Sequence, residues 1–167
     1  PDTDCMSTIA ERTRALLEEI ARLEARHGRA PGSVTLLGIS KTHDAARVRE
    51  AHAAGLSQFG ESYVQEALPK IEALADLPLT WHFVGRIQGN KTAAIAGGFA
   101  WVHGIDRLRI ARRLDEQRPP HLPPLDCCIE VNLSGEASKG GATPQELPAL
   151  ATAIAALPRL RLRGLMT

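Results

Sequence analysis

The sequence is poor in aromatic residues, and it lacks both an excess of charge of one sign and a long hydrophobic run. Aromatic residues make up 4% of the 167 residues, so the core has to be built from Leu, Ala, Val and Ile. Twenty Lys and Arg residues against 19 Asp and Glu residues give a formal net charge of +1, with no basic block. This balance gives no electrostatic case for nucleic acid as the main partner. No apolar run approaches the roughly 20 residues that span a bilayer, which argues against an integral membrane protein.

The three cysteines form neither a disulfide framework nor a CxxC motif. Cys127 and Cys128 are adjacent, so they cannot both point to one face of a strand, and we expect buried free thiols in a reducing cytoplasm. The N-terminus has no cationic stretch followed by an apolar segment, as a secretory signal would have. The chain begins with Pro1 rather than Met. We therefore expect residues 1–6 to be a disordered N-terminal extension and residues 7–167 to form the domain.

Helix and strand signals alternate along the chain. Thr8 and Glu11 form a capping-box pattern at the start of a helix that we expect to end at Gly28. The predicted strands begin near residues 34, 57, 80, 100, 125 and 160, and the predicted helices between them cover about 44–54, 62–75, 90–96, 106–117 and 144–156. This alternation predicts a parallel sheet with right-handed crossovers. A doubly wound sheet and a (β/α)8 barrel both satisfy it, but a barrel needs eight strands and the pattern predicts six.

Lys41 is the strongest candidate for chemistry. Period-two alternation places it on one face of the first strand with Leu37 and Ile39, at the carboxyl end of the strand, where parallel α/β folds build their sites. An amine that is partly desolvated there has a lowered pKa and can attack a carbonyl to form a Schiff base. The alternative is a solvated lysine that opens a loop.

Polar side chains also follow the second and third strands. Glu61 and Ser62 either meet a ligand or cap the next helix. Tyr63 is the only tyrosine of the chain. His82 is predicted to lie on the opposite face of its strand from Trp81, and the lack of a second ligand at suitable spacing argues against a metal site.

The fourth and fifth strands are followed by similar groups. Asp106 is a plausible N-cap of the following helix. Asn132 lies at the carboxyl end of the fifth strand, and the Ser, Gly and Lys residues after it suit an anion-binding loop or a mobile lid. This loop matches neither of the glycine-rich phosphate motifs, so the indication is weak.

Taken together and in order, these segments resemble the pyridoxal phosphate homeostasis protein family, whose members look like the isolated barrel of the alanine racemase N-terminal domain. The matching stretches are residues 37–42, 59–66, 81–85 with 88–91, 102–106, 130–136 and 163–167. Each is weak alone, but six in register at the ends of successive strands are specific.

The resemblance implies an α/β fold of the TIM type, a (β/α)8 barrel with only about six of its eight βα units present. It implies that Lys41 forms an internal aldimine with pyridoxal 5'-phosphate, and that no residue is catalytic. The implied cofactor-binding residues are Lys41, Ser62, His82, Asn132 and Met166. It further implies a cytoplasmic protein, monomeric when complete, that hands the cofactor to PLP-dependent apoenzymes by transimination.

The chain departs from the family pattern at three strand ends and at its C-terminus. Ser62 stands where the family usually has Asn, Gly104 where it has Ser, and Glu130 where it has Gln. Two further βα units, which carry the phosphate cradle of the family, lie outside these 167 residues.

Two alternatives stay open. The related racemases use the cofactor lysine as one base and a tyrosine from a separate β-domain as the other. This sequence predicts no β-domain, and Tyr63 follows the second strand, so racemase activity is the weaker hypothesis. The other alternative is a cofactor-free scaffold in which Lys41 is incidental.

Overall fold

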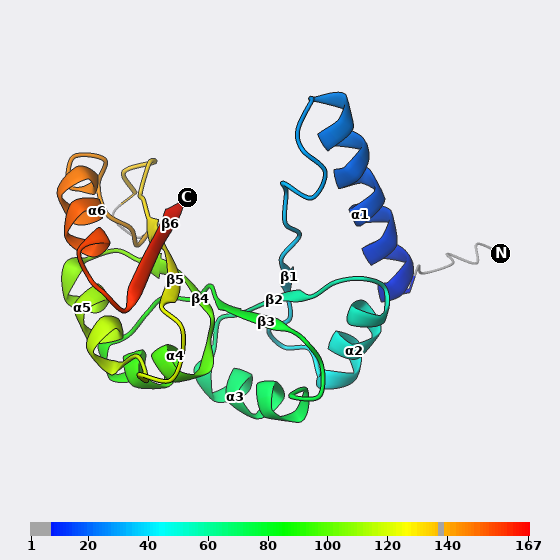
Figure 1. Ribbon diagram of the computed structural model, residues 1–167, viewed down its shortest axis with the longest axis horizontal. Coiled ribbons are helices and arrows are strands. Elements are labelled where there is room, and N and C mark those ends of the chain that lie inside the picture. Colours follow the sequence, from blue (N-terminus) through cyan, green and yellow to red (C-terminus); the bar gives the residue numbers. More distant parts are fainter. Residues whose placement is uncertain (1–7, 137–138) are drawn as a thin grey trace.

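Six parallel strands form a single sheet in which every strand lies beside its neighbour in sequence (Figure 1). The computed structural model describes residues 8–136 and 139–167, so the extension expected over residues 1–6 lies outside the described residues. The strands are β1 (Gly38–Ile39), β2 (Gln58–Glu61), β3 (Thr80–Phe83), β4 (Trp101–Ile105), β5 (Leu125–Glu130) and β6 (Leu160–Met166). A sequential order of parallel strands is the order of a (β/α) barrel, which confirms the predicted fold class.

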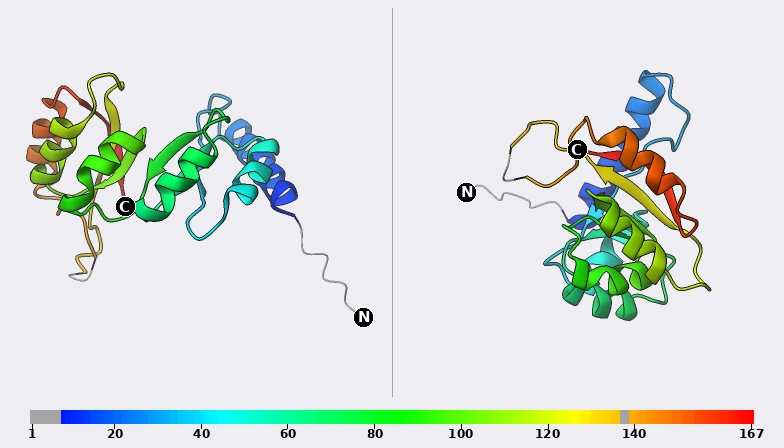
Figure 2. Two further views of the ribbon diagram at one scale, coloured as in Figure 1. Left: turned by 90° about the horizontal axis from the view of Figure 1, so that it is seen from below. Right: turned by 90° about the vertical axis from the view of Figure 1, so that its left-hand side faces the viewer.

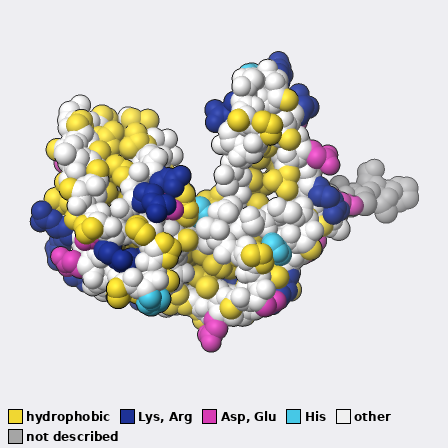
Figure 3. Space-filling view, in the orientation of Figure 1, with side chains coloured by type: hydrophobic (Ala, Val, Ile, Leu, Met, Phe, Trp, Pro, Cys, Tyr) yellow, Lys and Arg dark blue, Asp and Glu magenta, His cyan; other side chains and the backbone are white. Residues whose placement is uncertain are grey.

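Helices cover the outer face of this sheet, and its inner face is open. They are α1 (Ile9–Arg26), α2 (Ala45–Ala53), α3 (Val64–Ala73), a 3-10 turn (Gly89–Lys91) leading into α4 (Thr92–Gly98), α5 (Leu108–Gln117) and α6 (Leu147–Ala155). The sheet curves, so that α1 rises at one end and β6 with α6 at the other (Figures 1 and 2). The space-filling view shows a hollow between these two ends (Figure 3). The described strands therefore form part of a barrel wall.

The core lies between the outer face of the sheet and the helices. Phe59, Val102 and Ile129 of the strands are almost fully buried, as are Ile95 of α4 and Leu114 of α5. Each such side chain contributes about 1.5–3 kcal/mol to folding when it leaves water. Because the helices pack only on this face, the alternate side chains of the same strands are left for the inner face and its chemistry.

The first helix confirms the predicted capping box. Thr8 Oγ1 accepts a hydrogen bond from Glu11 N at 3.1 Å, and Thr8 N donates to Glu11 Oε2 at 2.8 Å. The helix ends at Arg26, two residues before Gly28, which adopts φ 63°. No helix in the described part of the chain is long and apolar enough to cross a membrane.

Two local predictions were wrong. The first strand was expected from residue 34, but β1 contains only Gly38 and Ile39. The chain before it bonds to α1 instead, because the buried Glu24 carboxylate accepts hydrogen bonds from Val34 N at 2.7 Å and Gly32 N at 2.9 Å.

Asp106 was expected to cap the helix after β4, and it does not. The N-cap residue of α5 is Arg107, and no side chain caps this end. Asp106 forms an ion pair with the side chain of Arg107 at 3.0 Å instead.

Candidate functional site

Lys41 occupies the turn between β1 and α2, and its side chain is exposed. The predicted face of the first strand is confirmed for Leu37 and Ile39, since a Cβ placed on Gly60 of β2 would lie 3.6 Å from Leu37 Cδ2 and 2.7 Å from Ile39 Cδ1. Ser40 points to the opposite side and is buried. The turn thus separates a buried hydroxyl from an exposed amine at adjacent positions.

The residue after Lys41 has an unusual backbone. Thr42 has φ 65°, and it is the one non-glycine residue with a positive φ in the described part of the chain. A β-branched side chain is unfavourable in this region, so the surrounding structure has to hold it there. Thr42 N donates a hydrogen bond to Glu66 Oε1 of α3, and His43 N donates to Ser40 O at 3.1 Å. These two contacts fix the turn on both sides of the lysine.

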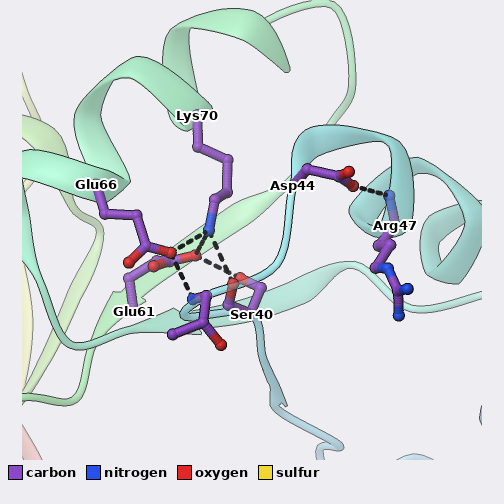
Figure 4. A network of polar contacts seen from close by, with 7 residues as sticks. Ser40, Asp44, Arg47, Glu61, Glu66 and Lys70 are labelled. Carbon is purple, nitrogen blue, oxygen red and sulfur yellow. Dashed lines mark hydrogen bonds and ion pairs between the residues drawn. The ribbon is translucent and has the colours of Figure 1, made fainter.

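A buried lysine on α3 joins these contacts into a network (Figure 4). Lys70 Nζ donates to Ser40 O at 2.8 Å, to Glu61 Oε1 at 2.6 Å and to Glu66 Oε1 at 3.1 Å. Ser40 Oγ donates to the same Glu61 oxygen at 2.6 Å. The Glu61 side chain has no exposed area, and its Oε2 accepts no hydrogen bond from the described residues. The Thr42 amide, and then Lys70, hold the pKa of Glu66 below its usual value.

Neither polar residue at the end of β2 caps α3. Its N-cap residue is Tyr63, which makes no side-chain capping bond. Glu61 is committed to Ser40 and Lys70, whereas Ser62 lines a cavity of about 70 Å³ together with Arg86 and Lys91. Of the two predicted roles for these residues, capping is therefore wrong.

His82 lies on the inner face within a polar cluster, on the opposite side of β3 from Trp81, as predicted. Its Nε2 lies 2.8 Å from Gln58 Oε1 and its Nδ1 lies 2.9 Å from His103 Nε2, so side chains occupy both ring nitrogens. The Trp101 ring stacks on the imidazole with the centroids 5.3 Å apart. Burial, and then the neighbouring His103, lower the pKa of His82 from 6.5 to about 4. The imidazole is therefore neutral at physiological pH.

Asn132 organises the loop that follows β5. Its Nδ2 donates to Glu136 O at 2.9 Å and to Lys139 O at 3.3 Å, while its Oδ1 accepts from Gly135 N at 3.0 Å. The residue lines a cavity of about 400 Å³ that also includes Glu130. The loop after β5 was expected to bind an anion or to act as a lid. In the structure, the side-chain amide of Asn132 holds the backbone of this loop.

Met166 ends β6 and pairs in register with Glu130. The implied cofactor residues thus fall into two groups, with Lys41 and Ser62 at the ends of β1 and β2, and Asn132 and Met166 at the ends of β5 and β6. All four lie at carboxyl ends of strands. His82 lies within its strand, in the cluster described above.

Gly104 and Glu130, two of the positions that depart from the family pattern, lie next to each other in the structure. A Cβ on Gly104 would lie 3.5 Å from Glu130 Oε2 and 2.9 Å from Gly85 O. The absence of a side chain at Gly104 therefore leaves room for the Glu130 carboxylate. Burial, and then Asp106, raise the pKa of Glu130, and Arg86 opposes this shift.

The sequence did not reveal Gln58, Glu66 or Lys70 as parts of these clusters. The one available signal was the spacing of four residues between Glu66 and Lys70 on a predicted helix, which suits an ion pair. That spacing does not say that the lysine is buried, because most such pairs lie on exposed helix faces.

Comparison with known proteins gives matches over nearly the whole chain. Residues 12–167 match the family model described as alanine racemase, N-terminal domain. The pyridoxal phosphate homeostasis protein of Pseudomonas aeruginosa is 61% identical over 161 residues, which cover 96% of this chain and 70% of that protein. The protein of the same name from Escherichia coli strain K12 is 49% identical over 164 residues, with coverages of 96% and 70%.

Solved structures agree with these matches. PipY of Synechococcus elongatus with PLP bound superposes with a TM-score of 0.76 at 38% identity, over 95% of this chain and 69% of that chain. Alanine racemase of Corynebacterium glutamicum superposes with a TM-score of 0.66 at 21% identity, over 94% of this chain and 42% of that chain. The second likeness concerns the fold alone.

Proposed function

Because the chain belongs to the pyridoxal phosphate homeostasis protein family, with the fold of the alanine racemase N-terminal domain, we propose that it binds pyridoxal 5'-phosphate covalently through Lys41 and serves in the homeostasis of this cofactor. The observation that carries the proposal is the turn around Lys41, which presents an exposed amine at the carboxyl end of β1. PipY, 38% identical, has been solved with PLP bound.

The residues of this turn fit an aldehyde cofactor. A lysine that attacks an aldehyde has to reach its carbon and be free of a carboxylate partner, because an ion pair keeps the amine protonated. Lys41 is exposed, and no carboxylate of the described residues forms an ion pair with it. On the inner face beside it, Gly60 leaves no room for a side chain, because an added Cβ would lie 2.7 Å from Ile39 Cδ1 and 3.3 Å from Val84 Cγ1.

Pyridoxal phosphate, when bound, supplies an aldehyde carbon that a neutral amine attacks with loss of water. Lys41 provides that amine at the edge of the open inner face. Ser62 offers a hydroxyl group at the end of β2, Asn132 shapes the loop after β5 through its side-chain bonds, and Met166 offers an apolar side chain at the end of β6. His82 lies on the inner face within β3, and because its pKa is lowered to about 4, its side chain adds no charge there.

We assign the chain a carrier role rather than a racemase activity. A racemase of this fold needs a second base opposite the lysine, and Tyr63 is the only tyrosine of these 167 residues. Tyr63 is 55% exposed at the start of α3, in the same βα unit that supports the Lys41 turn. A cytoplasmic location, a monomeric complete protein and PLP-dependent apoenzymes as recipients belong to this proposal. Their support is the cofactor role and the named function of the relatives.

A titration of the purified chain with pyridoxal phosphate, followed by visible absorbance, tests this proposal. We expect a saturable absorbance band at one cofactor per chain, and we expect Lys41→Ala to abolish it. Arg109→Ala is the control, because it removes an exposed cation of α5 rather than a residue of the strand ends. An equal band in the Lys41 variant, or no saturable band in the parent chain, would overturn the proposal.

A further inference from the structure

We infer that Lys70 is a positioning residue for Lys41, and that it acts with Glu61 and Glu66 to hold the turn that presents the reactive amine. The part of this inference that concerns cofactor binding rests on the proposed function above. The part that concerns the shape of the turn depends only on the contacts of the chain itself.

The argument begins with which atoms the buried ammonium contacts. Lys70 Nζ donates to the carbonyl of Ser40, the residue before Lys41, at 2.8 Å. It also donates at 3.1 Å to the Glu66 oxygen that accepts from the amide of Thr42, the residue after Lys41. Lys70 thus contacts the residue before Lys41 directly and the residue after it through Glu66, which also belongs to α3 (Figure 4). The left-handed backbone of Thr42 is therefore held by a side chain of α3, which lies outside the turn that contains Thr42.

The charge of the network explains why a lysine occupies this position. Glu61 is fully buried, and without Lys70 its carboxylate would have Ser40 Oγ as its remaining partner among the described residues. Removing one partner of a buried ion pair leaves an uncompensated charge, which is far more costly than exchanging the pair for neutral groups. Lys70 therefore has to stay in place for the structure around the turn to be stable.

The same contacts make Lys70 and Lys41 differ in their reactivity toward an aldehyde. Lys70 uses its three donors on three oxygens and is 8% exposed, so its nitrogen has no lone pair available for an aldehyde. Lys41 is exposed and outside these ion pairs. The network therefore directs the cofactor to Lys41 while it keeps Lys70 unreactive.

Amide hydrogen exchange at Thr42 tests the positioning role without any cofactor. Glu66→Ala removes the acceptor of this amide, and we expect exchange at Thr42 to become about tenfold faster or more, as for the loss of a bond to a charged group. Glu72→Ala is the control, since it truncates an exposed glutamate of the same helix. We expect it to leave the Thr42 rate unchanged.

Removal of the ammonium tests the central residue. Lys70→Met alone leaves the buried Glu61 carboxylate without a cationic partner, which destabilises the fold. The double variant Lys70→Met with Glu61→Gln removes both charges and is expected to fold. We expect faster exchange at Thr42 in this variant. Arg49→Met is the control, because it removes a cation from the exposed Arg49–Asp76 pair, which also links α2 to the segment after α3.

Borohydride trapping with pyridoxal phosphate then measures the consequence for Lys41. The measured quantity is the yield of reduced adduct at Lys41 divided by the yield at another exposed lysine of the same molecule. This ratio reports the positioning of Lys41 rather than the stability of the protein. We expect this ratio to fall severalfold in the double variant and in Glu66→Ala, and to stay at the parent value in Glu72→Ala and Arg49→Met.

The outcomes separate the two hypotheses. If the parent chain forms no preferred adduct at Lys41, the proposed function fails, while the Thr42 exchange rates still decide whether the network holds the turn. If the double variant and Glu66→Ala keep both the parent exchange rate and the parent labelling ratio, Lys70 has no positioning role. A lower melting temperature with those two readouts unchanged would likewise overturn the inference.

Discussion

His82 Nδ1 and His103 Nε2 lie 2.9 Å apart on the neighbouring strands β3 and β4. A single proton can lie between these two nitrogens, so at most one of them donates and the other has to be unprotonated. Gln58 Oε1 accepts from the other side of His82, at 2.8 Å. The two facing nitrogens therefore cannot both carry a proton, and burial, then the neighbouring His103, lower the pKa of His82 to about 4.

The histidine pair predicts a loss of stability in weak acid. The unfolded chain takes up a proton on His82 near pH 6.5, whereas the folded chain does so only near pH 4. The stabilisation is therefore complete above pH 6.5 and is lost as the pH falls through 6.5 toward 4, by roughly 1–3 kcal/mol. Denaturant unfolding curves at a series of pH values measure it.

Two variants test whether His82 causes this pH dependence of the unfolding free energy. His82→Gln should flatten the pH dependence between 6.5 and 4, whereas His121→Gln, at an exposed position, should leave it as in the parent. Because Trp101 stacks on His82, its fluorescence should change over the same acid range in the folded protein. An equally steep slope in His82→Gln would refute this explanation.

Gly85 predicts a steric effect at the end of β3. A Cβ at this position would lie 2.5 Å from Ser62 O and 2.9 Å from Ser62 Cα, and backbone atoms cannot move aside as a flexible side chain does. We expect Gly85→Ala to lower the free energy of unfolding by about 2–3 kcal/mol. Gly164→Ala, where no atom lies within 4 Å of the new Cβ, should change it by less than about 0.5 kcal/mol. Equal effects of the two changes would contradict the prediction.

Asn132 predicts a local rather than a global effect. Asn132→Ala removes the side-chain bonds to Glu136 O, Lys139 O and Gly135 N, so the loop should open without loss of the core. Tryptic cleavage after Lys139 should become severalfold faster while the melting temperature changes little. Ser134→Ala, which removes a single weaker contact at 3.3 Å, serves as the control. Cleavage at the parent rate would show that Asn132 does not hold this loop.

Arg118 predicts a large structural effect at the amino ends of β4 and β5, away from the carboxyl ends where the candidate site lies. Its guanidinium is buried and donates to Ala96 O at 2.6 Å, Phe99 O at 2.7 Å and Pro123 O at 2.8 Å. Arg118→Met leaves these carbonyls without their donor and should cost about 3 kcal/mol or more of unfolding free energy. Arg109→Met on the exposed side of α5 should cost less than about 0.5 kcal/mol. Similar losses in both variants would rule out a special role for Arg118.

The sequence predicted the order and type of the elements because period and punctuation are local signals. The capping box at Thr8 and the positions of the second to sixth strands agree with the structure. It failed where a distant side chain competes for the backbone. The expected start of the first strand at residue 34 is wrong because Glu24, ten residues earlier, accepts the Val34 amide.

The candidate site was predictable in part for the same reason. Lys41 was identified by its place at a strand end and by the family resemblance. The structure places it at that strand end, but exposed in the turn rather than partly desolvated as the strand-end argument expected. The contacts of Lys70 were not predictable, because they depend on how α3 packs against β1, which no local pattern specifies. The Gly104–Glu130 contact likewise joins two departures that are 26 positions apart in sequence.

The most direct test of this account is borohydride reduction of the chain with one equivalent of pyridoxal phosphate, followed by peptide mapping by mass spectrometry. Reduction fixes the bond between cofactor and amine as a secondary amine, so the map identifies the attached residue. The account predicts a single major adduct on Lys41, with Lys70 unmodified. Adducts spread over several lysines, or a major adduct on Lys70, would contradict it.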